Sequence, residues 1–186
     1  MKNHLILLAA VAVLAAAQGA TAATTSPAPA PSDAKAAFER LKQLAGTWTM
    51  PMPETKAEMK ADAKIPPQAT VNYKLTGGGS AVTETLFPGT EHEMLTVYHL
   101  DGNDLVLTHY CAAGNQPRMK AAIADGGKTL AFHFVGGSNI VPDKDVHMHE
   151  ATIKFVDADH VHAEWMMWQG GKQAEVKEFE LTRQKN

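Results

Sequence analysis

Four side chains with metal-binding chemistry occur as two closely spaced pairs. His109 and Cys111 are two residues apart, and so are His147 and His149. Alternate residues of a β-strand share a face, so in strands each pair would lie side by side. Imidazole and thiolate suit zinc and copper, which need three or four converging ligands. If both faces turn into one lumen, the sequence predicts a zinc or copper site. The alternative is that His109 is a hydrogen-bonded core histidine and Cys111 a small buried apolar residue.

Another group of side chains is suited to holding a small organic molecule. Arg118 follows the loop 112–117, and its guanidinium can pair with a carboxylate or another anion on an amphipathic ligand, or tie the loop instead. Apolar and aromatic side chains would bury the rest of such a ligand. The candidates are Met119, Tyr73, Phe132 and Trp168, of which Trp168 belongs to a Trp-Met-Met-Trp run that is also typical of wall packing.

The elements that position these residues are almost all strands. Apolar residues alternate with polar ones, as in Val71, Tyr73 and Leu75, and turn signals such as Asp101-Gly102-Asn103 separate the runs. Before them, residues 32–45 have helical spacing, with Gly46 as a stop. The expected strands span 47–52, 69–76, 79–87, 91–100, 104–111, 118–124, 128–135, 146–156, 160–168 and 173–183. This pattern predicts an all-β fold, an antiparallel up-and-down barrel of about ten strands with a short N-terminal helix. Residues 53–67 do not fit a strand and are expected to form a short helical lid.

Gly46-Thr47-Trp48, at the start of the first expected strand, resembles the Gly-x-Trp signature of lipocalins and related calycins. In those families the Trp plugs the closed end of the barrel and an Arg from the last strand lies over it, which implies this role for Arg183. The expected lid is similar to that of fatty-acid-binding proteins. The stretch 107–119 also resembles a group of uncharacterised bacterial secreted lipocalin-like proteins. The resemblance implies a calycin-type β-barrel.

Strand direction in such a meander decides which end of the barrel each residue occupies. The last strand ends where the first begins, so Arg183 is expected beside Trp48. The residues with binding chemistry are expected at the opposite end. These are His109, Cys111, Arg118, Met119, His147 and His149.

Haem is a further cofactor to consider. Nitrobindin-type barrels of similar size bind haem through a His on the last strand. The corresponding stretch here, 178–181, has no His. This departure argues against haem, although His109 or His149 would be able to replace that ligand.

The beginning of the chain has the pattern of a secretory signal peptide. Lys2 precedes an apolar run over 5–17, and Ala20-Thr21-Ala22 supplies the small residues of a cleavage site. The predicted organisation is a signal peptide over 1–22 cut after Ala22, an Ala/Pro-rich linker over 23–34, and a lipocalin-like barrel over 35–186. The expected location is periplasmic or secreted, and no internal disulfide is possible with one cysteine.

Charge and hydropathy limit the classes of partner that the protein is expected to bind. The net charge is −3 and no basic stripe is present, which argues against nucleic acid. No second apolar stretch is long enough for a membrane span in the mature protein. The sequence lacks a nucleophile elbow, a P-loop and a dinucleotide fingerprint, so it gives no argument for catalysis.

The sequence as a whole favours an exported protein that binds a small apolar or amphipathic molecule in an apolar lumen with a polar His/Cys/Arg rim. Two alternatives stay open. One is a zinc- or copper-binding protein, or a metal-dependent enzyme, that uses the His/Cys cluster. The other is a packed structural or interaction barrel without a ligand.

Overall fold

The computed structural model describes residues 33–51 and 68–185. The elements in these ranges are α1 Asp33–Lys42, β1 Gly46–Pro51, β2 Gln68–Thr76, η2 Gly77–Gly79, β3 Ala81–Leu86, β4 Met94–Asp101, β5 Asp104–Tyr110, β6 Gln116–Ala124, η3 Asp125–Gly127, β7 Thr129–Ser138, β8 His147–Phe155, β9 His160–Gln169 and β10 Lys172–Arg183. The predicted signal peptide over 1–22 and the predicted lid over 53–67 lie outside the described residues. The predicted linker also lies outside them up to residue 32, whereas Asp33 and Ala34 begin α1.

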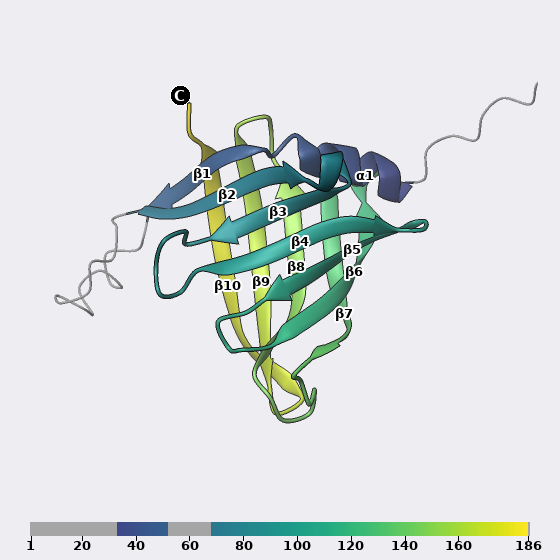
Figure 1. Cartoon of the computed structure of the whole chain (residues 1–186), viewed down its shortest axis with the longest axis vertical. Coiled ribbons are helices and arrows are strands. Elements are labelled where there is room, and N and C mark those ends of the chain that lie inside the picture. The colour runs from purple at the N-terminus through teal and green to yellow at the C-terminus, as the bar shows by residue number, and fades with distance from the viewer. Residues whose placement is uncertain (1–32, 52–67, 186) are drawn as a thin grey trace, which may run out of the picture. The chain divides into compact units, whose positions relative to one another are not determined.

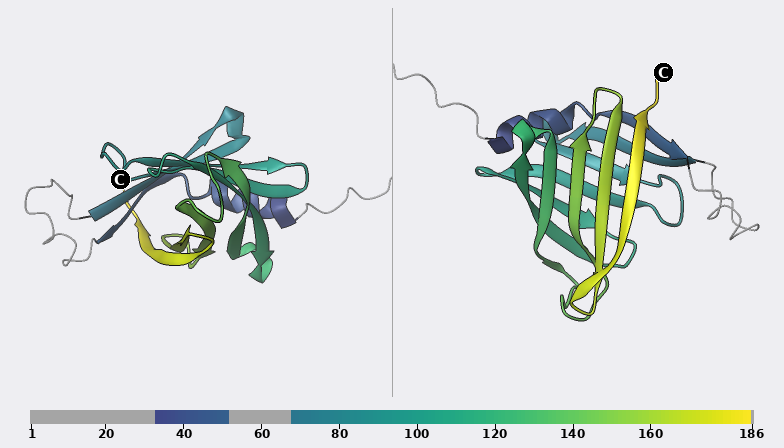
Figure 2. Two further views of the ribbon diagram at one scale, coloured as in Figure 1. Left: turned by 90° about the horizontal axis from the view of Figure 1, so that it is seen from below. Right: turned by 180° about the vertical axis from the view of Figure 1, so that it is seen from behind.

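The ten strands form one closed barrel in which each strand pairs with its sequence neighbours and β1 pairs with β10. All ten pairs are antiparallel. Strands β2 to β4 cross the front of the barrel, and β8 to β10 run behind them at a steep angle (Figures 1 and 2). The predicted all-β, ten-stranded up-and-down barrel with a short N-terminal helix is confirmed.

The β4–β5 hairpin sets the register on which the interior depends. Asp101 pairs with Asp104, so the turn holds only Gly102 and Asn103. Gly102 has a φ of 59°, a left-handed conformation that glycine adopts without a Cβ clash. The register that follows places Thr96 directly opposite His109.

Alternation along the strands separates the lumen from the surface. In β3, Val82, Glu84 and Leu86 are buried while their neighbours are partly exposed. In β5, Leu105, Leu107 and His109 are buried in the same way. A carboxylate and an imidazole therefore stand on faces that are otherwise apolar.

Helix α1 and Trp48 close one end of the barrel. Ala37, Phe38 and Leu41 bury the apolar face of α1, which contacts β4, β5, β6 and η3. The Trp48 indole N–H donates to the carbonyl oxygen of Leu44 at 2.8 Å. None of the helices in the described ranges has the length and hydropathy to cross a membrane.

Arg183 lies over Trp48, as predicted. Its guanidinium carbon is 4.3 Å from the Trp48 ring centroid, and the two residues are paired across β1 and β10. The guanidinium also donates to the carbonyl oxygens of Ala45 at 3.0 Å and Gln43 at 2.7 Å. One side chain thus joins the last strand, the first strand and the end of α1.

Replacing Arg183 with methionine is expected to lower the free energy of unfolding by about 2–3 kcal/mol. The variant loses the cation–π contact and three hydrogen bonds to carbonyl oxygens, of Gln43, Ala45 and Ala158. Urea unfolding followed by tryptophan fluorescence measures the change. Lys185→Met is the matched control, since Lys185 makes only an exposed ion pair with Asp159 at 3.1 Å and should cost less than about 0.5 kcal/mol. Equal costs for the two variants would contradict the assigned role of Arg183.

Three bulges occur at the ends of strands away from Trp48. One residue has no partner in each of the pairs β6–β7, β8–β9 and β9–β10, namely Val135, His149 and Ala174. A bulge adds one residue to one strand and re-aims the side chains beyond it. The predicted common face of His147 and His149 is therefore interrupted, because His149 itself is the extra residue.

Candidate functional site

A buried carboxylate is at the centre of a polar network in the lumen. Glu84 is 2% exposed. Tyr73 donates its hydroxyl to Oε1 of Glu84 at 2.8 Å, and Tyr98 donates to Oε2 at 2.6 Å. Thr96 is the cross-strand partner of Glu84, and its hydroxyl group favours the ionised carboxylate. Hydrogen bonds to Glu84 thus connect the side chains of strands β2, β3 and β4.

The network continues to a histidine on β5. Oγ1 of Thr96 is 2.9 Å from Nδ1 of His109, whose side chain is 1% exposed. The His109 ring lies against Trp165 from β9, with ring centroids 4.6 Å apart. Its other nitrogen, Nε2, is buried and has no hydrogen-bond partner among the described residues. A buried polar nitrogen without a partner costs about 1–3 kcal/mol, so Nε2 of His109 is an unused hydrogen-bonding position in the interior.

Burial dominates the electrostatics of this network. It raises the pKa of Glu84, while the three hydroxyl groups lower it by stabilising the carboxylate. Burial and the Glu84 charge together hold the pKa of Tyr73 and of Tyr98 well above the usual range. Burial lowers the pKa of His109 to about 4, so its imidazole is neutral at pH 7.

A second cluster of rings lies where β7 and β8 separate. Their pairing stops at His133 and Glu150. Beyond that point the rings of Phe134, His147, His149 and Trp168 contact one another. His149 is stacked on Trp168 with centroids 3.8 Å apart, and Nε2 of His147 is 3.0 Å from Nδ1 of His149. Burial and the neighbouring His147 lower the pKa of His149.

Two loops meet beside this second cluster. Asn115 is buried and donates its side-chain amide to the carbonyl oxygen of Val146 at 2.7 Å. The Cys111 amide donates to the Asn115 carbonyl at 3.0 Å, and the Cys111 side chain is half-buried just beyond β5. Oδ1 of Asn115 and Nε1 of Trp168 are buried with no partner in the described ranges.

The four predicted metal ligands do not form one group. His109 belongs to the Glu84 network, whereas His147 and His149 contact each other in the second cluster. In residues 33–51 and 68–185, no three His, Cys, Asp or Glu side chains are arranged to hold a metal ion. His109 is held by Thr96 and Trp165, whereas His147 and His149 are held by each other, Phe134 and Trp168.

The predicted ligand-binding residues divide between the interior and the surface. Met119 and Phe132 are fully buried, and Phe132 packs against Tyr98 with centroids 5.6 Å apart. Tyr73 is buried on Glu84, and Trp168 is half-buried. Arg118 is exposed, because it is the strand neighbour of Met119 and so lies on the opposite face.

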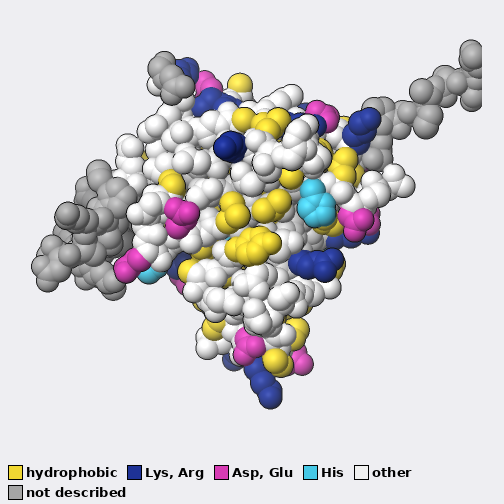
Figure 3. Space-filling view, viewed as in Figure 1, with side chains coloured by type: hydrophobic (Ala, Val, Ile, Leu, Met, Phe, Trp, Pro, Cys, Tyr) yellow, Lys and Arg dark blue, Asp and Glu magenta, His cyan; other side chains and the backbone are white. Residues whose placement is uncertain are grey.

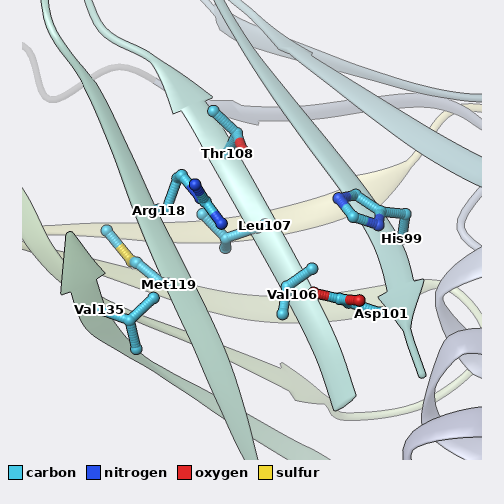
Figure 4. A pocket seen from close by; sticks show the side chains of 8 residues that line it. All are labelled: His99, Asp101, Val106, Leu107, Thr108, Arg118, Met119 and Val135. Carbon is cyan, nitrogen blue, oxygen red and sulfur yellow. The ribbon is translucent and has the colours of Figure 1, made fainter. Parts of the chain in front are cut away.

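Arg118 lines a recess on the outside of the barrel. The recess has a volume of about 240 Å³ and is formed across β4 to β7. In Figure 4, Arg118 points from β6 toward β5 beside Leu107, and His99 lies on β4 on the other side of β5. Figure 3 shows apolar side chains gathered on the front of the barrel, with histidine and basic side chains beside them. A group bound by Arg118 would therefore be outside the lumen.

Sequence reasoning missed Glu84, Thr96, Tyr98 and Asn115. The signal for Glu84 was present, since it is the one acid in the alternating series Val82, Glu84, Leu86. A charged residue on an apolar strand face is stable only when polar groups pair with it. In the structure these groups are the inward hydroxyl groups of β2 and β4.

Comparison with known proteins gives no family assignment: no protein-family model matches the chain, and no curated protein matches it significantly. The function is therefore argued from the geometry of the barrel interior.

Proposed function

We propose that the protein is an exported, lipocalin-like carrier or sensor that binds a small apolar or amphipathic molecule in the barrel lumen. The observation that carries the proposal is the buried Nε2 of His109, which has no partner in the described part of the chain and belongs to an otherwise paired polar network. Binding sites for small molecules combine apolar walls with a few fixed polar groups. Trp165, Phe132 and Met119 supply the walls here.

Ala151 is a small residue of the barrel wall close to the proposed site. Ala151 is 2% exposed and pairs with Phe132 on one side and Trp165 on the other. Protein interiors are close-packed, so a larger side chain at this position would extend between the two aromatic side chains into the lumen. This position offers a direct way to block the proposed site.

Native mass spectrometry with elemental analysis tests the proposal on protein expressed with its leader and purified without a tag or chelator. The protein is expected to carry an organic molecule at one equivalent, and the chain mass is expected to correspond to cleavage after Ala22. Ala151→Leu should lose the bound molecule, because the added side chain occupies its space. Ala122→Leu, at an exposed position of β6, is the matched control and should keep it.

Two results would contradict lumen binding. Stoichiometric zinc or copper without an organic molecule would favour the metal-binding alternative. An empty protein that also takes up no added apolar probe would favour a packed barrel. Thermal unfolding of both leucine variants shows whether either has lost its fold, so loss of binding is compared only between folded proteins.

A further inference from the structure

We infer that the recess on the outside of the barrel is a second binding site, which takes a small organic anion with one carboxylate on a compact apolar body, such as a single aromatic ring. The inference concerns the outer face of the sheet and does not depend on binding in the lumen. It follows from the shape of the recess, from the charge of Arg118 and from the position of Asp101.

A bulge and a glycine on β7 shape one side of the recess. Val135 is the residue without a partner in the β6–β7 pair, and its side chain is 60% exposed beside the recess. The next residue, Gly136, is the cross-strand partner of Arg118, and a Cβ added there would meet no atom within 4 Å. The β7 side of Arg118 is therefore open, and Val135 on β7 and Val106 on β5 supply apolar walls.

The size of the recess suits one ring. Leu107 and Met119 pair across β5 and β6 and are fully buried, so the recess lies outside them, over the paired backbones of these strands. Its volume of about 240 Å³ is enough for an aromatic ring that carries one carboxylate, since a closed cavity of about 150 Å³ holds benzene.

Arg118 is the positive charge at the β6 end of the recess. Within 33–51 and 68–185, its guanidinium makes no hydrogen bond or ion pair with another residue. Lys120, two residues along the same face of β6, differs, because its ammonium is 2.8 Å from Oδ2 of Asp104. A guanidinium binds a carboxylate through two parallel hydrogen bonds. Arg118 points toward β5, where Thr108 is its cross-strand partner, so a carboxylate between the two strands is within its reach (Figure 4).

Asp101 gives the other end of the recess a negative charge. It belongs to β4, and in the described part of the chain no basic side chain pairs with it. Strand β5 separates it from Arg118 on β6, so the two backbones are about 10 Å apart or more. A second carboxylate at the far end of a ligand would face Asp101 and be repelled. The recess therefore favours a monocarboxylate over the dicarboxylate with the same ring.

Three matched probes test this preference: benzoate, benzamide and terephthalate. They keep the aromatic ring and change only its polar groups. Nitrogen–proton NMR titrations of the purified protein at pH 8.0, where an ordinary imidazole carries little charge, report the binding residue by residue. Benzoate is expected to bind with a Kd of about 1–10 mM, typical of so small a ligand, and to shift the amides of Thr108, Arg118 and Val135. Benzamide and terephthalate should bind about five-fold more weakly.

Variants assign the preference to the two charges. Arg118→Gln should weaken benzoate about five-fold, to the affinity of benzamide. Lys120→Gln is the matched control, since Lys120 is also exposed on β6 but its charge is already paired with Asp104, and it should change the affinity less than about two-fold. Asp101→Asn should raise the affinity for terephthalate to that for benzoate.

Several results would overturn the inference. Equal binding of benzoate and benzamide, or an unchanged affinity of Arg118→Gln, would remove the role of Arg118. Terephthalate bound as tightly as benzoate by the unaltered protein would remove that of Asp101. Shifts at the buried residues Leu130 and Phe132 instead of the recess would place the carboxylate in the lumen, which would overturn the second site and support the proposed function. Unshifted recess amides at about 50 mM benzoate, in a protein that carries an organic molecule, would overturn the second site alone.

Discussion

Replacing Glu84 with leucine is expected to lower the free energy of unfolding by about 3–5 kcal/mol, the largest effect we expect from a single side chain in the lumen. Leucine removes the acceptor for the hydroxyl groups of Tyr73 and Tyr98, and each buried donor left without a partner costs about 1–3 kcal/mol. Urea unfolding at pH 7 measures the difference.

Two further variants separate lost hydrogen bonds from altered packing. Glu84→Gln keeps the size and one oxygen acceptor, so it should cost about 1–2 kcal/mol. Combining Glu84→Leu with Tyr73→Phe and Tyr98→Phe removes both orphaned donors and should recover part of the lost stability. A triple variant no more stable than Glu84→Leu alone would show that the hydroxyl groups are not the source of the cost.

Acid is expected to destabilise the protein through His109 by about 3 kcal/mol. Its pKa is lowered by burial from 6.5 to about 4. Between these values the unfolded chain binds a proton that the folded protein excludes, so stability falls as pH falls through this window and the loss is complete below about pH 4. The size follows from about 1.36 kcal/mol for each pKa unit.

The difference between the wild type and His109→Gln measures this loss. Unfolding free energies at pH 7.0, 5.5 and 4.0 should converge for the two proteins as the pH falls, because glutamine does not titrate. The raised pKa of Glu84 has the opposite effect on the pH dependence. Stability falls as the pH rises above the pKa that Glu84 has in the unfolded chain, because the folded protein holds that proton more tightly. This contribution is present in both proteins and largely cancels in the difference. Parallel curves would mean that His109 is protonated as easily in the folded protein as in the unfolded chain.

The barrel was predictable because its signals are local and repeated. Alternation in segments such as Val71, Tyr73 and Leu75 gives strands, and glycine turns join them. Strand direction alone then placed Arg183 beside Trp48. None of these inferences depends on strand register. In a closed meander the order of the strands determines which strands are neighbours, whereas the register determines which residues face each other.

The site was only partly predictable, because it depends on registers and bulges. His109 was identified as an unusual residue, but its partner Thr96 follows from the two-residue turn at Gly102 and Asn103. A turn longer by one residue would place a different side chain opposite the imidazole. The expected common face of His147 and His149 assumed an unbroken period of two, which the extra residue at His149 interrupts. The alternation of apolar and polar residues does not show where one extra residue is inserted into a strand.

The closure of the barrel by β1 and β10 has a kinetic consequence. Nine of the ten strand pairs join segments that follow each other in the chain, whereas Arg183 reaches the carbonyl oxygen of Ala45 across 138 positions. The chain loses conformational entropy when such distant segments come together, and this loss precedes any favourable contact between them. Contacts that form late in folding determine the rate of unfolding and have little influence on the rate of folding. The seam at Trp48 and Arg183 is therefore a determinant of native-state lifetime.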